Sequence, residues 1–89
     1  MAEIIRRASA GTLESSDAYV EIEPCSTLEL FVQSVVQAQF GAAIEALVRR
    51  TLRDLGVSAA RVTVNDRGAL DCVLRARVET AVLRGGGGE

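Results

Sequence analysis

The spacing of apolar residues changes along this chain of 89 residues, and that change limits the folds open to it. Up to position 33 apolar residues recur at every second position, which is the pattern of strands with one buried face. From position 36 they recur at every third or fourth position, which is the pattern of a helix with one buried face. The chain is long enough for one small domain. We therefore expect strands first and an amphipathic helix after them.

Four segments are predicted as strands, at residues 8–13, 18–23, 28–33 and 60–65. In the second segment Ala18, Val20 and Ile22 share one face, as in a half-buried strand. Only residues 24–27 separate it from the third segment, so these two strands are predicted to form a hairpin. The first segment is predicted as a short edge strand, joined to the same sheet through a polar turn.

Two segments are predicted as helices. The first follows a capping box at Ser34-Val35-Val36-Gln37, and Gly56 ends it. Its predicted buried face consists of Val36, Phe40, Ile44, Leu47, Val48, Leu52 and Leu55. The second begins at about Ala69, after a turn at residues 65–68. Cys72 is expected to pack beside Leu70 and Leu74 on this helix. Its predicted buried face consists of Leu70, Val73, Leu74, Val78, Ala81 and Val82.

The predicted order is β-β-β-α-β-α, which places the chain in the α+β class. Two amphipathic helices can cover one face of a small, mostly antiparallel sheet and leave the other face to solvent. Residues 1–84 are predicted to form this single domain. Residues 85–89, four glycines and a glutamate, are predicted to be a flexible tail because glycine loses much backbone entropy when it is ordered.

The composition disfavours several classes of function. The chain has no histidine and no lysine, so the usual general base and the Schiff-base nucleophile are both missing, and we expect a protein that is not an enzyme. A net charge of −2 leaves no basic surface for nucleic acid. No apolar run is long enough to span a membrane, and the first residues lack the apolar core of a signal peptide, so a cytoplasmic location is expected. Cys25 and Cys72 are then expected to be reduced thiols, and two cysteines without histidine predict no metal site.

A polar turn at Glu14-Ser15-Ser16-Asp17 carries two hydroxyls between two acids. Such a turn is ordinarily only a solvated chain reversal. The chain offers no histidine or lysine to take a proton from either serine, so neither is expected to act as a nucleophile. If one of them has a chemical role, it is as the acceptor of a group that another enzyme attaches.

Three separated blocks of this sequence resemble the acyl carrier (gamma) subunit of citrate lyase over about residues 10–79. The blocks are Ala10-Gly11-Thr12-Leu13-Glu14-Ser15 with Asp17, then Gln39-Phe40-Gly41, then Asp66 with Gly68-Ala69-Leu70-Asp71-Cys72, Leu74, Ala76-Arg77 and Glu79. They follow one another in the family's order and at its spacing. The serine that the family modifies falls on Ser15, in the Leu-Glu-Ser register. Ser16 stands where the family commonly has glycine and is a second hydroxyl one position away.

The resemblance implies that the chain carries an acyl group and does not transform it. In that family the serine bears 2'-(5''-phosphoribosyl)-3'-dephospho-CoA through a phosphodiester, and the thiol at the end of this arm holds acetyl and citryl thioesters. The implied partners are the alpha subunit (acyl transferase), the beta subunit (citryl lyase) and the transferase that attaches the arm. A flexible tether keeps the acyl group at high local concentration for both partner sites.

Two other interpretations stay open. The carrier of malonate decarboxylase uses a related cofactor, although its serine usually lies in a Gly-Ser-Gly-Asp setting, and an interaction domain without any cofactor is the alternative from another class. The acids of the turn are open as well: Glu14 and Asp17 are either solvated turn residues or contacts for a basic surface on the transferase or the partner subunits.

Overall fold

The computed structural model describes residues 3–86. Over this range the chain forms four strands and two helices in the predicted order β-β-β-α-β-α. The strands are β1 (Ala8–Gly11), β2 (Ala18–Glu23), β3 (Leu28–Ser34) and β4 (Ala60–Asp66), and the helices are α1 (Gln37–Asp54) and α2 (Asp71–Gly85). The α+β class and the order of elements are confirmed.

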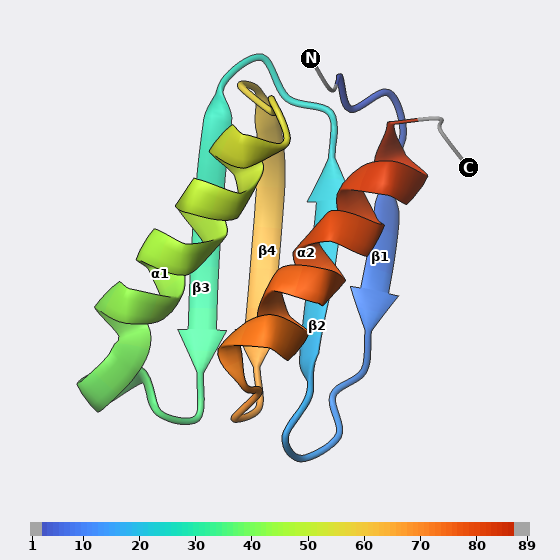
Figure 1. The fold of residues 1–89 in the computed structure, drawn as a ribbon. Helices are drawn as coiled ribbons and strands as arrows, with labels where there is room; N and C mark the ends of the chain where they lie inside the picture. Colours follow the sequence, from blue (N-terminus) through green and yellow to red (C-terminus); the bar gives the residue numbers. More distant parts are fainter. Residues whose placement is uncertain (1–2, 87–89) are drawn as a thin grey trace.

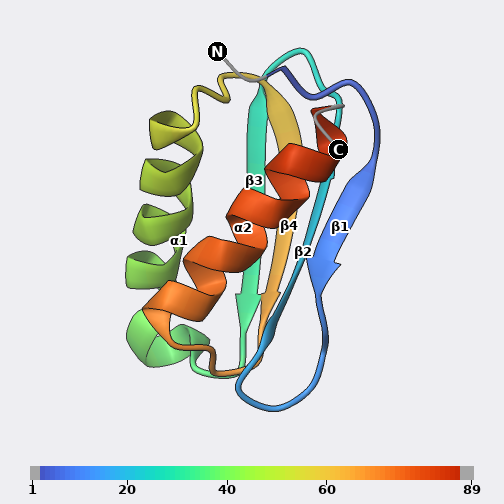
Figure 2. The ribbon, with the colours of Figure 1, turned by 45° about the vertical axis from the view of Figure 1, so that its right-hand side comes forward.

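Both helices pack on the same face of the sheet, as Figures 1 and 2 show from two directions. The core lies between these two layers, and the alternating residues of β2 and β4 supply its floor, with Val20, Val62 and Val64 fully buried. From the helices Val48, Leu52, Leu74 and Val78 cover them, exposed by 2% or less. The mostly antiparallel sheet with one covered face is therefore confirmed.

The prediction that β2 and β3 form a hairpin is wrong. The sheet order is β1-β2-β4-β3, so β4 lies between the two strands. β4 pairs antiparallel with β2 and parallel with β3, and α1 makes the crossover that parallel pairing requires. Residues 24–27 are long enough to step across the position of one intervening strand, because neighbouring strands lie only about 4.8 Å apart.

The predicted capping box at Ser34 is also wrong. Ser34 is the last residue of β3, and its hydroxyl donates to a carboxylate oxygen of Asp66 at 2.8 Å and accepts from the Val36 amide at 3.0 Å. Helix α1 begins three residues later, at Gln37, and Val36 stands at its N-cap without a side-chain hydrogen bond. The serine hydroxyl thus ties the end of β3 to the end of β4 and does not cap the helix.

Three residues predicted to be buried are exposed instead. Phe40 is 52% and Leu70 is 71% exposed, and Cys72 is exposed as well. All three lie at the N-terminal ends of their helices, before the first buried large apolar side chain, which is Ile44 in α1 and Leu74 in α2. Helical periodicity identifies the stripe that faces inward, but it carries no information about where the opposing layer ends.

The two ends of the described chain are joined to each other. The amides of Ile5 and Arg6 both donate to the carbonyl of Gly85, at 2.9 and 3.1 Å, and Ile4 is buried. Gly85 is itself a buried residue in the last turn of α2, so it does not belong to the tail where it was predicted. Gly86 follows as the C-cap of the helix, and its amide donates to the carbonyl of Val82 at 2.8 Å. The remaining residues of the predicted tail, 87–89, lie outside the described residues.

Candidate functional site

Residues 12–17, which we call the serine loop, connect β1 to β2. The amide of Asp17 donates to the carbonyl of Glu14 at 3.1 Å, and this bond closes a β-turn with Ser15 and Ser16 at its centre. Ser15 is exposed. In Figure 1 the loop lies at the lower end of the sheet, the end at which both helices begin. The structure therefore confirms the turn and the link from the first strand into the sheet.

The serine loop is held against the turn that follows β4. The amide of Ser16 donates to the carbonyl of Arg67 at 2.8 Å, and the amide of Arg67 donates to the carbonyl of Asp17 at 2.9 Å. These bonds continue the antiparallel pairing of β2 with β4 one step past the Ala18–Asp66 pair. The backbone on both sides of Ser15 is thus anchored while its side chain points to solvent.

Asp17 is the central anchor of the loop. Its carboxylate accepts two hydrogen bonds from the guanidinium of Arg77 in α2, both at 2.9 Å, and this paired geometry is the strong form of such a contact. The same carboxylate accepts from the Thr12 hydroxyl and from the Ala18 amide, both at 2.7 Å. Four donors therefore converge on the two oxygens, and they join the loop, β2 and α2 at one point.

The ionisation of Asp17 follows from these contacts. Hydrogen bonds from Arg77, and then from Thr12 and the Ala18 amide, hold the pKa of Asp17 well below its usual range. A carboxylate with a lowered folded-state pKa contributes stability above its ordinary pKa of about 4, and loses that contribution only as the pH falls through the lower value. The pair of Asp17 with Arg77 is therefore fully formed throughout the neutral range.

The two acids of the loop have different environments. The Asp17 side chain is only 14% exposed and its oxygens are already occupied, so it positions the loop and offers little surface to a partner. Glu14 is exposed. Sequence reasoning missed the role of Arg77, although Asp17 and Arg77 both stood in the blocks that carried the family resemblance. The occurrence of both residues in the family blocks was the feature of the sequence that could have indicated that they pair.

Ser16 adopts a backbone conformation that is unusual for its residue type. Its φ is +68°, and it is the one non-glycine residue with a positive φ between positions 3 and 86. A positive φ at the third position of a β-turn is the mark of a type II turn, which normally has glycine there. The serine at this position therefore strains the loop.

Replacing Ser16 by glycine is expected to stabilise the protein. The left-handed conformation costs about 1–2 kcal/mol for a residue with a Cβ, and the greater freedom of glycine in the unfolded chain offsets about 0.5–1 kcal/mol of the gain. We expect Ser16→Gly to raise the free energy of unfolding by about 0.5–1 kcal/mol, measured by urea denaturation. Ser15→Gly is the matched control and is expected to lower it, and a Ser16→Gly variant no more stable than the parent would contradict the strain.

A groove lies between the first half of α1 and the turn that leads into α2, at the same end of the sheet as the serine loop (Figure 1). We call it the helix-end groove, and its volume is about 420 Å³. Its lining residues are Val36, Phe40, Ala43, Ile44, Asp66, Gly68, Ala69 and Asp71. Asp66 is 1% exposed, and its carboxylate accepts hydrogen bonds from the Ser34 hydroxyl and from the amides of Gly68 and Ala69. Asp66 therefore shapes the floor of the groove.

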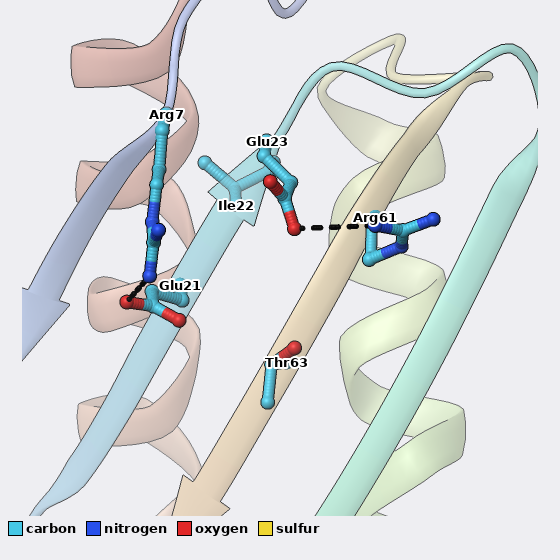
Figure 3. A pocket seen from close by; sticks show the side chains of 6 residues that line it. All are labelled: Arg7, Glu21, Ile22, Glu23, Arg61 and Thr63. Atoms are coloured by element: carbon cyan, nitrogen blue, oxygen red, sulfur yellow. Dashed lines mark hydrogen bonds and ion pairs between the residues drawn. The ribbon is translucent and has the colours of Figure 1, made fainter.

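The open face of the sheet holds a second depression, which Figure 3 shows from close by. It encloses about 10 Å³, room for about one water molecule. Arg7 pairs with Glu21 at 2.7 Å, and Arg61 pairs with Glu23 at 3.5 Å and with Glu29 at 2.9 Å. Because these charges are paired with one another in a shallow space, this face is a solvated surface and not a ligand site.

Other kinds of site are not found in the described part of the chain. Residues 3–86 contain no group of three metal-binding side chains, and neither helix there is long and apolar enough to cross a membrane. Cys25 and Cys72 are free thiols. The whole sequence lacks histidine and lysine, the usual bases that activate a serine nucleophile. What the site offers is an exposed hydroxyl on an anchored turn, which suits a residue that another enzyme modifies.

Comparison with known proteins agrees with this description. The family model for acyl carrier proteins described as the malonate decarboxylase delta subunit matches residues 5–85. Two similar curated proteins are the citrate lyase acyl carrier proteins of Escherichia fergusonii and Haemophilus influenzae (strain PittEE). The first is 56% identical over 84 residues, covering 92% of this chain and 87% of the relative, and the second is 54% identical over 82 residues, covering 92% and 86%.

A solved structure is similar as well. A chain in the crystal structure of a Pseudomonas malonate decarboxylase hetero-tetramer in complex with malonate superposes with a TM-score of 0.78 at 26% identity. The superposition covers 97% of this chain and 93% of that chain. The α+β arrangement of two helices on a four-stranded sheet is therefore shared with a subunit of a multisubunit enzyme.

Proposed function

The chain belongs to the citrate lyase acyl carrier protein family, and on that premise we propose that it is the acyl carrier subunit of a citrate lyase complex, with Ser15 as the residue that carries the prosthetic group. The observation that carries the proposal is the exposed Ser15 on a turn that Asp17 and Arg77 anchor to α2. A carrier must present its attachment point to several enzymes, and this turn does so without catalytic groups of its own.

The serine loop suits a bulky covalent group. Its hydrogen bonds use Thr12, Ser16, Asp17 and Arg77, so esterification of the Ser15 hydroxyl leaves each of them in place. We assign 2'-(5''-phosphoribosyl)-3'-dephospho-CoA, joined through a phosphodiester, as the group. When bound, it supplies the thiol on which acyl groups are carried, while the protein supplies position and recognition.

The partners in this proposal are the alpha (acyl transferase) and beta (citryl lyase) subunits and the transferase that attaches the arm. Glu14 is the acid of the loop that is free to meet a basic surface on one of them, because Asp17 is committed to Arg77. The carrier itself is not an enzyme in this assignment. We also place it in the cytoplasm, where Cys25 and Cys72 remain reduced.

The carrier of malonate decarboxylase is the second candidate. The matching family description and the structural similarity to a chain of the Pseudomonas hetero-tetramer favour it. Sequence identity separates the two candidates, since the citrate lyase relatives reach 54–56% while that chain shares 26%. The Leu13-Glu14-Ser15 register, which differs from a Gly-Ser-Gly-Asp setting, also supports the citrate lyase assignment.

Modification of Ser15 tests the proposal directly. We expect the intact mass of the chain, isolated from cells that make the prosthetic group and its transferase, to rise by the mass of one phosphoribosyl-dephospho-CoA group. Ser15→Ala is expected to abolish the gain completely, because the acceptor hydroxyl is lost. Ser16→Gly, the matched control one position away, is expected to keep it.

The other outcomes are equally informative. A gain that survives Ser15→Ala but not Ser16→Gly would move the site to Ser16. No gain in any variant, with the transferase shown to be active on a known carrier, would contradict the carrier role and support an interaction domain without a cofactor. Release of oxaloacetate from citrate, after the modified chain is combined with citrate lyase alpha and beta subunits, then separates citrate lyase from malonate decarboxylase.

A further inference from the structure

The helix-end groove begins where the serine loop is anchored. Ser16 donates its amide to the carbonyl of Arg67, and Gly68 and Ala69, the next two residues, line the groove. Ser15 is next in sequence to Ser16, whose partner Arg67 directly precedes two lining residues of the groove. A group attached to Ser15 therefore begins at the end of the fold where the groove lies (Figure 1).

The lining of the groove selects among the parts of such a group. Val36, Phe40 and Ile44 form an apolar wall, and the only charged lining residues are the carboxylates of Asp66 and Asp71. Carboxylates without a cation repel a diphosphate. Asp66 is buried and already accepts three hydrogen bonds, so the exposed Asp71 is the carboxylate that can accept a hydrogen bond from a hydroxyl or amino group. The groove thus favours a neutral moiety rich in hydrogen-bond donors over a charged one.

The volume of the groove and its aromatic residue narrow further which part of the attached group it can bind. A volume of about 420 Å³ is within the range of pockets that hold small ligands, about 300–1,000 Å³. Phe40 is 52% exposed, so its ring offers a flat apolar surface of the kind on which nucleic-acid bases stack. A nucleoside combines a flat base with an amino group and hydroxyls that can donate to carboxylates.

We propose that the helix-end groove binds the nucleoside part of the group carried on Ser15, with the base against Phe40 and its donors toward Asp71. The inference rests on the proposed carrier function. The nucleoside is the part nearest the attachment point, since a single phosphoribosyl unit separates it from the serine. The diphosphate and the thiol end then stay outside the groove, where the thiol can reach the partner sites.

The test compares amide chemical shifts of the unmodified chain and of the chain whose complete modification is verified by intact mass. We expect shift changes in the serine loop and, separately, at residues 36–44 and 66–71, together with nuclear Overhauser contacts between base protons and the Phe40 ring. Phe40→Ala is expected to abolish the shift changes at residues 36–44. The matched control, Phe31→Ala, removes an equally exposed phenylalanine, 55% exposed in β3, and is expected to retain them.

The results separate this inference from the carrier proposal. A verified mass gain with shift changes confined to the serine loop, and without contacts to the Phe40 ring, overturns the groove assignment alone and leaves the groove free for a partner subunit. Absence of a mass gain with an active transferase overturns both. The contacts to Phe40 are measured in the unaltered sequence, so the test does not depend on whether a variant folds.

Discussion

Replacing Gly11 by alanine is expected to be among the most damaging single changes in this chain, with a loss of about 3 kcal/mol or more in the free energy of unfolding. Gly11 has a φ of +93°, which already costs a residue with a side chain about 1–2 kcal/mol. In addition, a Cβ at this position would overlap the carbonyl of Ala18 on the neighbouring strand. The backbone would have to move at the point where β1 enters the serine loop.

Gly68→Ala is the matched control for this prediction. Gly68 has nearly the same φ, +91°, but a Cβ there would meet nothing within 4 Å. We expect its replacement to cost only the conformational penalty of the positive φ, about 1–2 kcal/mol. The measurement is urea denaturation of both variants. The unfolding midpoints are compared when the slope of the unfolding free energy against urea concentration is the same in both. Equal losses in the two variants would show that the contact with Ala18 does not contribute.

Replacing Asp66 by alanine is expected to have the second large effect, a loss of about 3 kcal/mol. Its buried carboxylate accepts from the Ser34 hydroxyl at 2.8 Å, from the Ala69 amide at 3.0 Å and from the Gly68 amide at 3.2 Å. Removing it leaves these donors without their acceptor at the joint between β3, β4 and α2. For a domain of this size the midpoint of thermal unfolding is then expected to fall by about 12–24 °C.

Asp71→Ala is the control for Asp66. Asp71 lines the same groove and carries the same charge, but it is exposed and lies in the first turn of α2. Its loss is expected to cost only the interaction with the helix dipole, about 0.3–1 kcal/mol. Calorimetry of both variants measures the difference, and a small loss for Asp66→Ala would mean that water replaces the carboxylate at the joint.

Apolar periodicity predicted most of the secondary structure. The alternation at Ala18, Val20 and Ile22 identified β2 with its observed bounds, because a strand with one buried face must alternate. The stripe of α1 was correct from Ile44 to Leu52 and wrong at Phe40, where the helix begins before its buried stretch. Local pattern determines which way a side chain faces, but not whether another layer lies opposite.

The site was predictable only in part, for a related reason. The polar turn and the family resemblance indicated Ser15 as the acceptor residue, and the structure places it exposed on an anchored turn. The two hydrogen bonds from the Arg77 guanidinium to Asp17 could not be derived from the spacing of residues in the sequence. The same is true of the three hydrogen bonds that the Asp66 carboxylate accepts. Arg77 lies 60 residues from Asp17 in sequence, and only the docking of α2 on the sheet brings their side chains together.

By itself, then, the sequence determined the strands and helices, their order and the inward faces of β2 and β4. It also showed a serine hydroxyl in a chain without histidine or lysine to activate it. The tertiary structure decided that β4 lies between β2 and β3, that Asp17 is an anchor and that a groove opens at the end of the fold that carries Ser15 (Figure 1). The periodicity of apolar residues is local, so it can be read along the chain. The choice of a strand's neighbour depends on which pairing buries the most apolar surface once both helices have docked, and that comparison exists only in three dimensions.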